Sequence, residues 1–202
     1  MKKSILIVAS IVATVAACDS AVPKSEAAPQ PETVKHVVDS VIPMDVAMDR
    51  FRAGLEEPSK LRGNLTSRDA LVKEFVRALE ESDTMALEQI AVNRAEWAWL
   101  YYPTNALFKP PYELPPALAW FQLQQADRKG ALRALRELGG HRIDVKGYVC
   151  DPEPTLEGDN KVWTGCRVTL SRDGADPVTI RLFGAILERG GVFEILSYDN
   201  DF

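Results

Sequence analysis

The stretch Phe183-Gly-Ala-Ile-Leu-Glu-Arg-Gly-Gly-Val-Phe-Glu-Ile-Leu-Ser-Tyr198 decides the fold class of this chain. Two apolar runs rich in Ile, Leu, Val and Phe flank the dipeptide Gly190-Gly191. Glycine adopts the positive φ values that a tight hairpin turn requires. The stretch therefore predicts two antiparallel strands, over residues 177–188 and 192–199.

A period of two in the hydrophobic pattern begins at Arg142, well before this hairpin. It predicts two further strands, over residues 142–150 and 162–171, and Asp173-Gly174 marks a tight turn after the second. We therefore expect an antiparallel sheet of four strands or more in the last third of the chain.

Helical patterns precede the strands. Apolar residues at helical spacing predict helices over 45–57, which Pro58 ends, and over 67–81, where Thr66 and Asp69 form a capping pattern. A short helix around Leu87 follows, and Asn93 with Glu96 suggests the cap of another helix. We expect the last helix over 117–138, with a break near 127–130. Helices followed by a sheet predict an α+β domain over residues 45–202.

The N-terminus has the order of a secretory signal. Lys2 and Lys3 precede an uncharged run from Ile5 to Ala17, and Cys18 follows. The run has about 13 residues, whereas a membrane-spanning helix needs about 20. A transmembrane anchor is therefore disfavoured, and we expect residues 1–17 to be a cleaved signal peptide.

Val15-Ala-Ala-Cys18 resembles the lipobox of bacterial lipoproteins. The resemblance implies cleavage before Cys18 and lipid attachment to that residue, which would anchor the chain to the inner or outer membrane of a bacterial cell envelope. Residues 18–44 are rich in Pro, Ala and charge, which predicts a disordered tether. The domain would then face the periplasm.

Cys150 and Cys166 remain as a pair. In an oxidising compartment an even pair favours a disulfide over two free thiols. The strand pattern argues for caution, because a regular hairpin would bury one cysteine and expose the other. A bulge at Gly147 or Gly165 would correct the parity.

The order of elements resembles the nuclear-transport-factor-2-like superfamily, which includes ketosteroid-isomerase-like proteins. The resemblance depends on the helix 67–81, the break at Glu81-Ser82-Asp83 before Leu87, and the two final strands. It implies a cone in which a bent antiparallel sheet wraps around N-terminal helices. Members of this superfamily include enzymes, ligand carriers and protein-binding modules, so the fold does not choose among them.

No catalytic, metal or cofactor motif stands out. The two histidines, His36 and His141, cannot form a metal cluster with the cysteines, and a net charge of −5 disfavours nucleic acid as a partner. The unusual feature is an aromatic group that suits either a core or a ligand pocket, with the proline-rich loop 103–116 as its lid. Its members are Trp97, Tyr101, Tyr102 and Trp120.

Three functions remain open on this sequence. The leading expectation is a non-catalytic module that binds a small apolar ligand or an envelope protein. The alternatives are an enzyme of the isomerase, dehydratase or cyclase type that uses an Asp or Tyr in the cone, and a scaffold within an envelope assembly.

Overall fold

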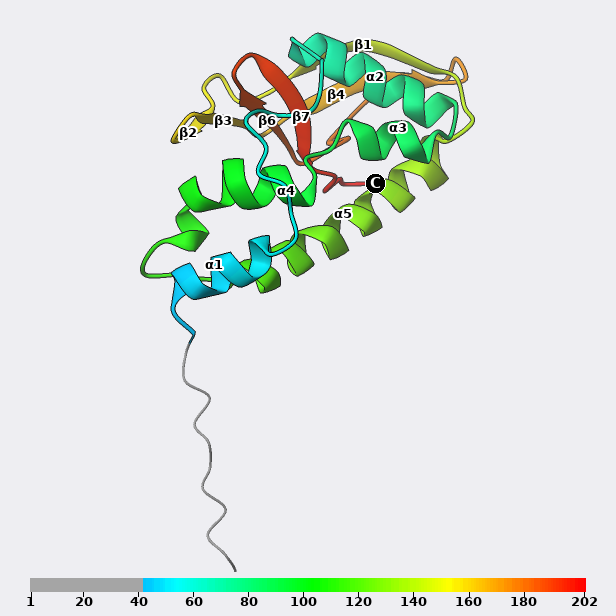
Figure 1. Ribbon diagram of the computed structural model, residues 1–202. Helices are drawn as coiled ribbons and strands as arrows, with labels where there is room; N and C mark the ends of the chain where they lie inside the picture. The colour runs from blue at the N-terminus through cyan, green and yellow to red at the C-terminus, as the bar shows by residue number, and fades with distance from the viewer. Residues whose placement is uncertain (1–41) are drawn as a thin grey trace, which may run out of the picture. The chain divides into compact units, whose positions relative to one another are not determined.

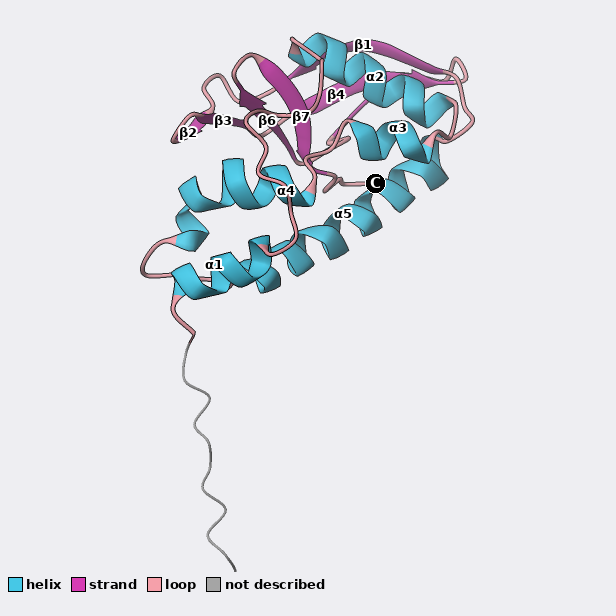
Figure 2. Ribbon diagram, in the orientation of Figure 1, coloured by secondary structure: helices cyan, strands magenta, loops and turns pink. Residues whose placement is uncertain are grey.

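The computed structural model describes residues 42–202. Figure 1 and Figure 2 show a layer of helices in the lower part of the view, and the strands with further helices beside them in the upper part. The helices are α1 (Met44–Arg52), α2 (Arg68–Glu80), α3 (Thr84–Gln89), α4 (Arg94–Glu96) and α5 (Pro116–Leu138). The strands are β1 (Ile143–Val149), β2 (Thr155–Glu157), β3 (Asn160–Trp163), β4 (Arg167–Arg172), β5 (Val178–Ile180), β6 (Ala185–Arg189) and β7 (Val192–Ser197). The expected α+β class is confirmed.

The strands form two antiparallel sheets, in the orders β1-β4-β5 and β2-β3-β6-β7. The two expected strands 162–171 and 177–188 are therefore each divided in two, because the chain passes from one sheet to the other within them. The first corner lies at Gly165, whose φ of +64° suits glycine. The second lies at Gly184, where a Cβ would fall 2.9 Å from Ser197 Oγ.

The sequence analysis missed β2. Glu157 and Asn160 are paired, so Gly158-Asp159 forms a two-residue hairpin loop between β2 and β3. Gly158 has a φ of +64°, which is the conformation that such loops require. The Gly-Asp dipeptide was the signal, but β2 contains only three residues and shows no clear alternation.

A bulge in β1 places both cysteines on the same side of the hairpin. The register between β1 and β4 shifts between Val145 and Gly147. Val149 is consequently exposed, although the unbroken pattern had placed it on the buried face. Past the end of this ladder, Cys150 and Cys166 face each other.

Two helix boundaries differ from the expected ones. The helix α1 ends at Arg52 rather than at residue 57, because Gly54 adopts a φ of +78° and turns the chain away. In α2 the N-cap is Ser67, not Thr66: its side chain accepts the backbone N–H of Ala70 at 3.1 Å. The predicted cap at Asn93 is confirmed, with Glu96 completing the capping box.

The last helix has no break. Asp127 and Gly130 both lie within α5, which runs without interruption from Pro116 to Leu138. Gly130 has a packing role instead, since a Cβ there would lie 2.0 Å from the carbonyl oxygen of Tyr198. In a sequence, a glycine that lets another segment approach a helix closely cannot be distinguished from a glycine that breaks the helix.

Two apolar clusters bury the two faces of the sheet β2-β3-β6-β7. On one face, Ile186 and Ile195 pack with α2, α3 and the end of α5. On the other, Leu187 and Leu196 pack with α1, with Trp97 and with the start of α5. Side chains therefore fill the space on both faces of this sheet, and the described residues 42–202 form one compact unit.

The proline-rich segment 103–116 is less extended than expected. Short 3₁₀ turns occupy Tyr102–Thr104 and Ala106–Phe108, and the Tyr102 hydroxyl donates to the carbonyl of Leu114.

Within residues 42–202, no helix combines the length and the apolar character needed to cross a membrane.

Candidate functional site

A groove of about 660 Å³ lies between α5 and the segment that runs from α3 to α4. The two walls run antiparallel, as two contacts show. The Cβ position of Gly139, after α5, lies 3.0 Å from Ser82 Oγ, just before α3. Trp97, after α4, has its ring centroid 5.3 Å from that of Trp120, near the start of α5. Figure 1 shows α3 beside one end of α5 and α4 beside the other.

One face of α5 forms the first wall of the groove. Positions 120, 124, 128, 131 and 135 line it, and their spacing of three and four residues places them on one helical face. From Trp120 to Leu135 the helix rises about 22 Å, at 1.5 Å per residue. The groove is therefore long relative to its volume, which suits an elongated ligand.

The end of β7 forms the floor. Asp127 Oδ1 accepts the backbone N–H of Tyr198 at 2.8 Å, and the Tyr198 hydroxyl donates to the carbonyl of Leu87. Burial raises the pKa of Asp127 to about 6, and burial also raises the pKa of Tyr198. These bonds attach β7 to α5 and to α3, so they hold the two walls of the groove in position.

Three arginines from separate segments reach the groove: Arg62, Arg94 and Arg128. Arg62 Nη2 donates to the carbonyls of Glu88 at 2.8 Å and Ala91 at 3.1 Å. Arg62 therefore packs against the C-terminal end of α3, which forms part of the groove wall. Arg94 Nη2 donates to the carbonyl of Phe51 at 3.1 Å. In the described part of the chain, Arg128 has no hydrogen bond or ion pair.

Two buried carboxyl groups lie behind the groove, Glu96 on α4 and Glu194 on β7, which are 1% and 0% exposed. Glu96 accepts the backbone N–H groups of Arg62 and Asn93, whereas Glu194 Oε1 accepts that of Gly63 at 2.7 Å. Burial, and then the charge of Glu96, raise the pKa of Glu194 to about 8. Glu194 therefore retains a proton at neutral pH.

The predicted aromatic group is mostly core. Trp97 and Tyr102 are 2% and 1% exposed and stack on each other with their centroids 4.1 Å apart. Tyr101 is half-buried, and its hydroxyl accepts the side-chain N–H of Asn105 at 2.8 Å. Of the four, only Trp120 lines the groove. For Trp97 and Tyr102 the core alternative therefore holds and the pocket alternative does not, because the two rings pack against each other.

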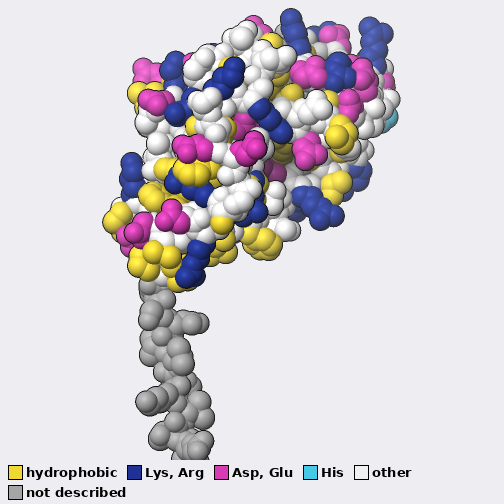
Figure 3. Space-filling model, viewed as in Figure 1, with side chains coloured by type: hydrophobic (Ala, Val, Ile, Leu, Met, Phe, Trp, Pro, Cys, Tyr) yellow, Lys and Arg dark blue, Asp and Glu magenta, His cyan; other side chains and the backbone are white. Residues whose placement is uncertain are grey.

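The proline-rich segment belongs to a second, smaller cleft of about 570 Å³. Glu113 and Pro115 line it opposite Met44 and Ala47 of α1. Around α1, Figure 3 shows hydrophobic side chains at the surface between charged ones. On the loop side, Glu113 is the one charged lining residue beside two prolines, and the cleft offers fewer polar side chains than the groove.

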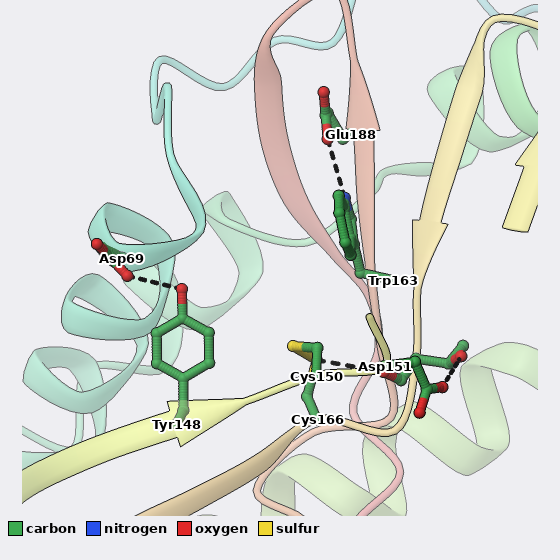
Figure 4. Close-up of a disulfide and its surroundings, with 8 residues drawn as sticks. Asp69, Tyr148, Cys150, Asp151, Trp163, Cys166 and Glu188 are labelled. Carbon is green, nitrogen blue, oxygen red and sulfur yellow. Dashed lines mark hydrogen bonds between the residues drawn. A yellow bond between two sulfur atoms is a disulfide. The ribbon is translucent and has the colours of Figure 1, made fainter. Parts of the chain in front are cut away.

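The structure joins Cys150 and Cys166 in a disulfide (Figure 4). In the same region, the Tyr148 hydroxyl donates to Asp69 at 2.7 Å and so attaches β1 to the start of α2. Cys18, the expected lipid attachment site, lies outside the described residues. Within those residues, no three His, Cys, Asp or Glu side chains come together as metal ligands.

Sequence reasoning missed the groove residues Asp127 and Arg128 and the buried residue Glu194. It had assigned the first two to a helix break. Glu194 is the one acid within the apolar run Val192–Leu196, and that position was the signal. An acid among apolar neighbours normally marks the solvent face of a strand. Here both faces of the strand are covered, so the same pattern marks a buried acid.

Comparison of the chain with protein-family models, with curated proteins and with solved structures finds no match.

Proposed function

We propose that this chain is a lipoprotein of a bacterial cell envelope, anchored to the membrane through Cys18, and that its domain binds an elongated apolar molecule in the groove along α5. The N-terminal pattern that ends in Val15-Ala-Ala-Cys18 supports the anchor. The groove is the observation that carries the binding function, because it is long and combines an apolar surface with polar and charged side chains from both walls.

The groove favours binding over catalysis. Asp127 is the one desolvated acid on its wall, and its Oδ1 already accepts a backbone N–H. The nearest phenol, Tyr198, donates its own proton to a backbone carbonyl. An enzyme of the isomerase type needs such a pair directed at a substrate. Here the two groups hold the floor of the groove together.

The anchor and the groove are tested separately. Cells that express the chain would be fed a clickable palmitate, and labelling of the wild-type chain is expected, with none on Cys18→Ser. For the groove, the chain would be purified from its envelope and co-purifying small molecules extracted for mass spectrometry. We expect an apolar species with the wild-type chain and none with Ala131→Trp, whose indole would fill the groove.

Gln122→Trp provides the matched control, because Gln122 is exposed on α5 and does not line the groove. It should retain the species. If Ala131→Trp retained as much of it as Gln122→Trp, the binding function would have to be given up. The palmitate-labelling test of Cys18→Ser is independent of this result, so the anchor would still be judged on its own.

A further inference from the structure

We propose that the ligand of the groove is an anionic amphiphile, a long-chain carboxylate or a molecule with a comparable acidic head, which lies with its head at the Trp120 end and its tail at the Leu135 end. This inference rests on the proposed function and specifies the chemical class of the ligand.

The two ends of the groove differ in chemistry. Toward the end of α5 its lining residues are Ala131, Leu132 and Leu135, and the facing wall is α3 with Thr84, Leu87 and Glu88. The three α5 side chains and Leu87 carry no polar atoms, so they suit a hydrocarbon tail. The tail end is accordingly defined by side chains from both walls.

Cationic groups lie in the middle of the groove and at its other end. Arg94 lies at the start of α4, three residues before Trp97, whose ring packs against Trp120. Arg128 is on the groove face of α5, and side chains on a helix lean toward its N-terminus, which here is the Trp120 end. Arg62 reaches the groove between these ends. Guanidinium groups bind carboxylates through paired, charge-assisted hydrogen bonds.

The three arginines differ in their ionic partners. Arg62 is paired with the buried Glu96, with 4.0 Å between Nε and Oε2. Asp127 and Glu88 also line the groove, but within residues 42–202 neither forms an ion pair with Arg94 or Arg128. Arg128 in particular has no partner within residues 42–202, and a bound anion would supply one.

The test uses the full chain in the membranes from which it comes. Two photoreactive probes would be compared, a diazirine-tailed fatty acid and the fatty alcohol of the same length and tail. After irradiation, peptide mapping locates the labelled residues. We expect the acid to label the segments around Leu87 and around Leu132 and Leu135, and the alcohol to need about tenfold more probe for equal labelling, since it lacks the ionic head.

Arg128→Gln should raise the acid concentration needed for half-maximal labelling by about tenfold and leave the alcohol unchanged. Arg136→Gln is the control, because Arg136 is on the same helix, is exposed and is paired with Glu137 at 2.9 Å. It should behave as the wild-type chain. Equal labelling of the groove by acid and alcohol would overturn the anionic head while leaving the proposed function intact. No labelling of the groove by either probe would overturn both.

Discussion

Glu194 accepts the backbone N–H of Gly63 at 2.7 Å from a fully buried position beside Glu96. The bond connects the middle of β7 to the segment between α1 and α2. A second bond, from Phe193 N–H to the carbonyl of Leu65 at 2.9 Å, continues the connection. Arg62, one residue before Gly63, lines the groove, so the buried acid pair supports one of its walls.

Stability should fall as the pH rises toward the alkaline side. The pKa of Glu194 is raised in the folded protein from 4.5 to about 8, so the native state binds a proton that the unfolded chain has released. Its contribution is fully present below pH 4.5 and is lost as the pH rises to about 8. Urea unfolding between about pH 5 and about pH 9 measures this slope.

Glu194→Gln should remove this part of the slope, because the amide keeps the shape of the protonated acid and cannot ionise. At about pH 9 the variant should be more stable than the wild-type chain by on the order of 3 kcal/mol, the cost of an uncompensated buried charge. Glu96→Gln is the contrast: both Glu96 oxygens accept backbone N–H groups, and an amide has only one acceptor oxygen, so that variant should lose stability. Equal effects of the two substitutions would contradict the proton assigned to Glu194.

Gly130→Ala should destabilise the domain, although alanine is the better helix former by about 1 kcal/mol. The new methyl group would lie 2.0 Å from the carbonyl oxygen of Tyr198, which must move. We expect a net loss of about 2 kcal/mol in thermal unfolding. Lys129→Ala, at the exposed neighbouring position, should change stability by less than about 0.5 kcal/mol. A stabilised Gly130→Ala variant would show that α5 and the end of β7 are not in close contact.

Reduction of the bond between Cys150 and Cys166 should lower the stability by roughly 3 kcal/mol in the chain-entropy description, given a sequence separation of 16 residues. Urea unfolding with and without a reductant measures this loss. The double variant Cys150→Ser/Cys166→Ser should unfold at the same urea concentration as the reduced wild-type chain, and the reductant should not change its stability. A response of the double variant to reductant would trace the effect to another cause.

Trp97→Ala should cost about 3–5 kcal/mol, the usual range for truncation of a buried aromatic side chain. Trp97 is 2% exposed and contacts the rings of Phe51, Tyr102 and Trp120. Phe121→Ala removes an aromatic side chain that is 57% exposed and should have little effect on unfolding. If both variants unfolded alike, the aromatic cluster would not be part of the core.

Local residue patterns predict which segments form helices and which form strands, and the order in which they follow one another. The alternation from Arg142 onward and the helical spacing in 67–81 are periodic over long segments, and such periodicity follows from burial of one face. The cap at Asn93 was also predictable, because a capping box involves only residues three apart. The conflict between two cysteines and a regular hairpin pointed to a bulge at Gly147 or Gly165, and the structure has it next to Gly147.

The sequence by itself determined the α+β class, the helix-before-strand order and the pairing chemistry of its cysteines, since these depend on short-range spacing. Only the tertiary structure decided that two expected strands cross between sheets, that Gly130 seats Tyr198 against an unbroken helix, and that Trp97 and Tyr102 fill their own pocket. The buried Glu194 and the arginine-lined groove also belong to this second group. Each of them depends on contacts between residues far apart in the chain, as Trp97 contacts Phe51 and Trp120 as well as Tyr102. Spacing along the chain carries no information about a partner that only folding brings near.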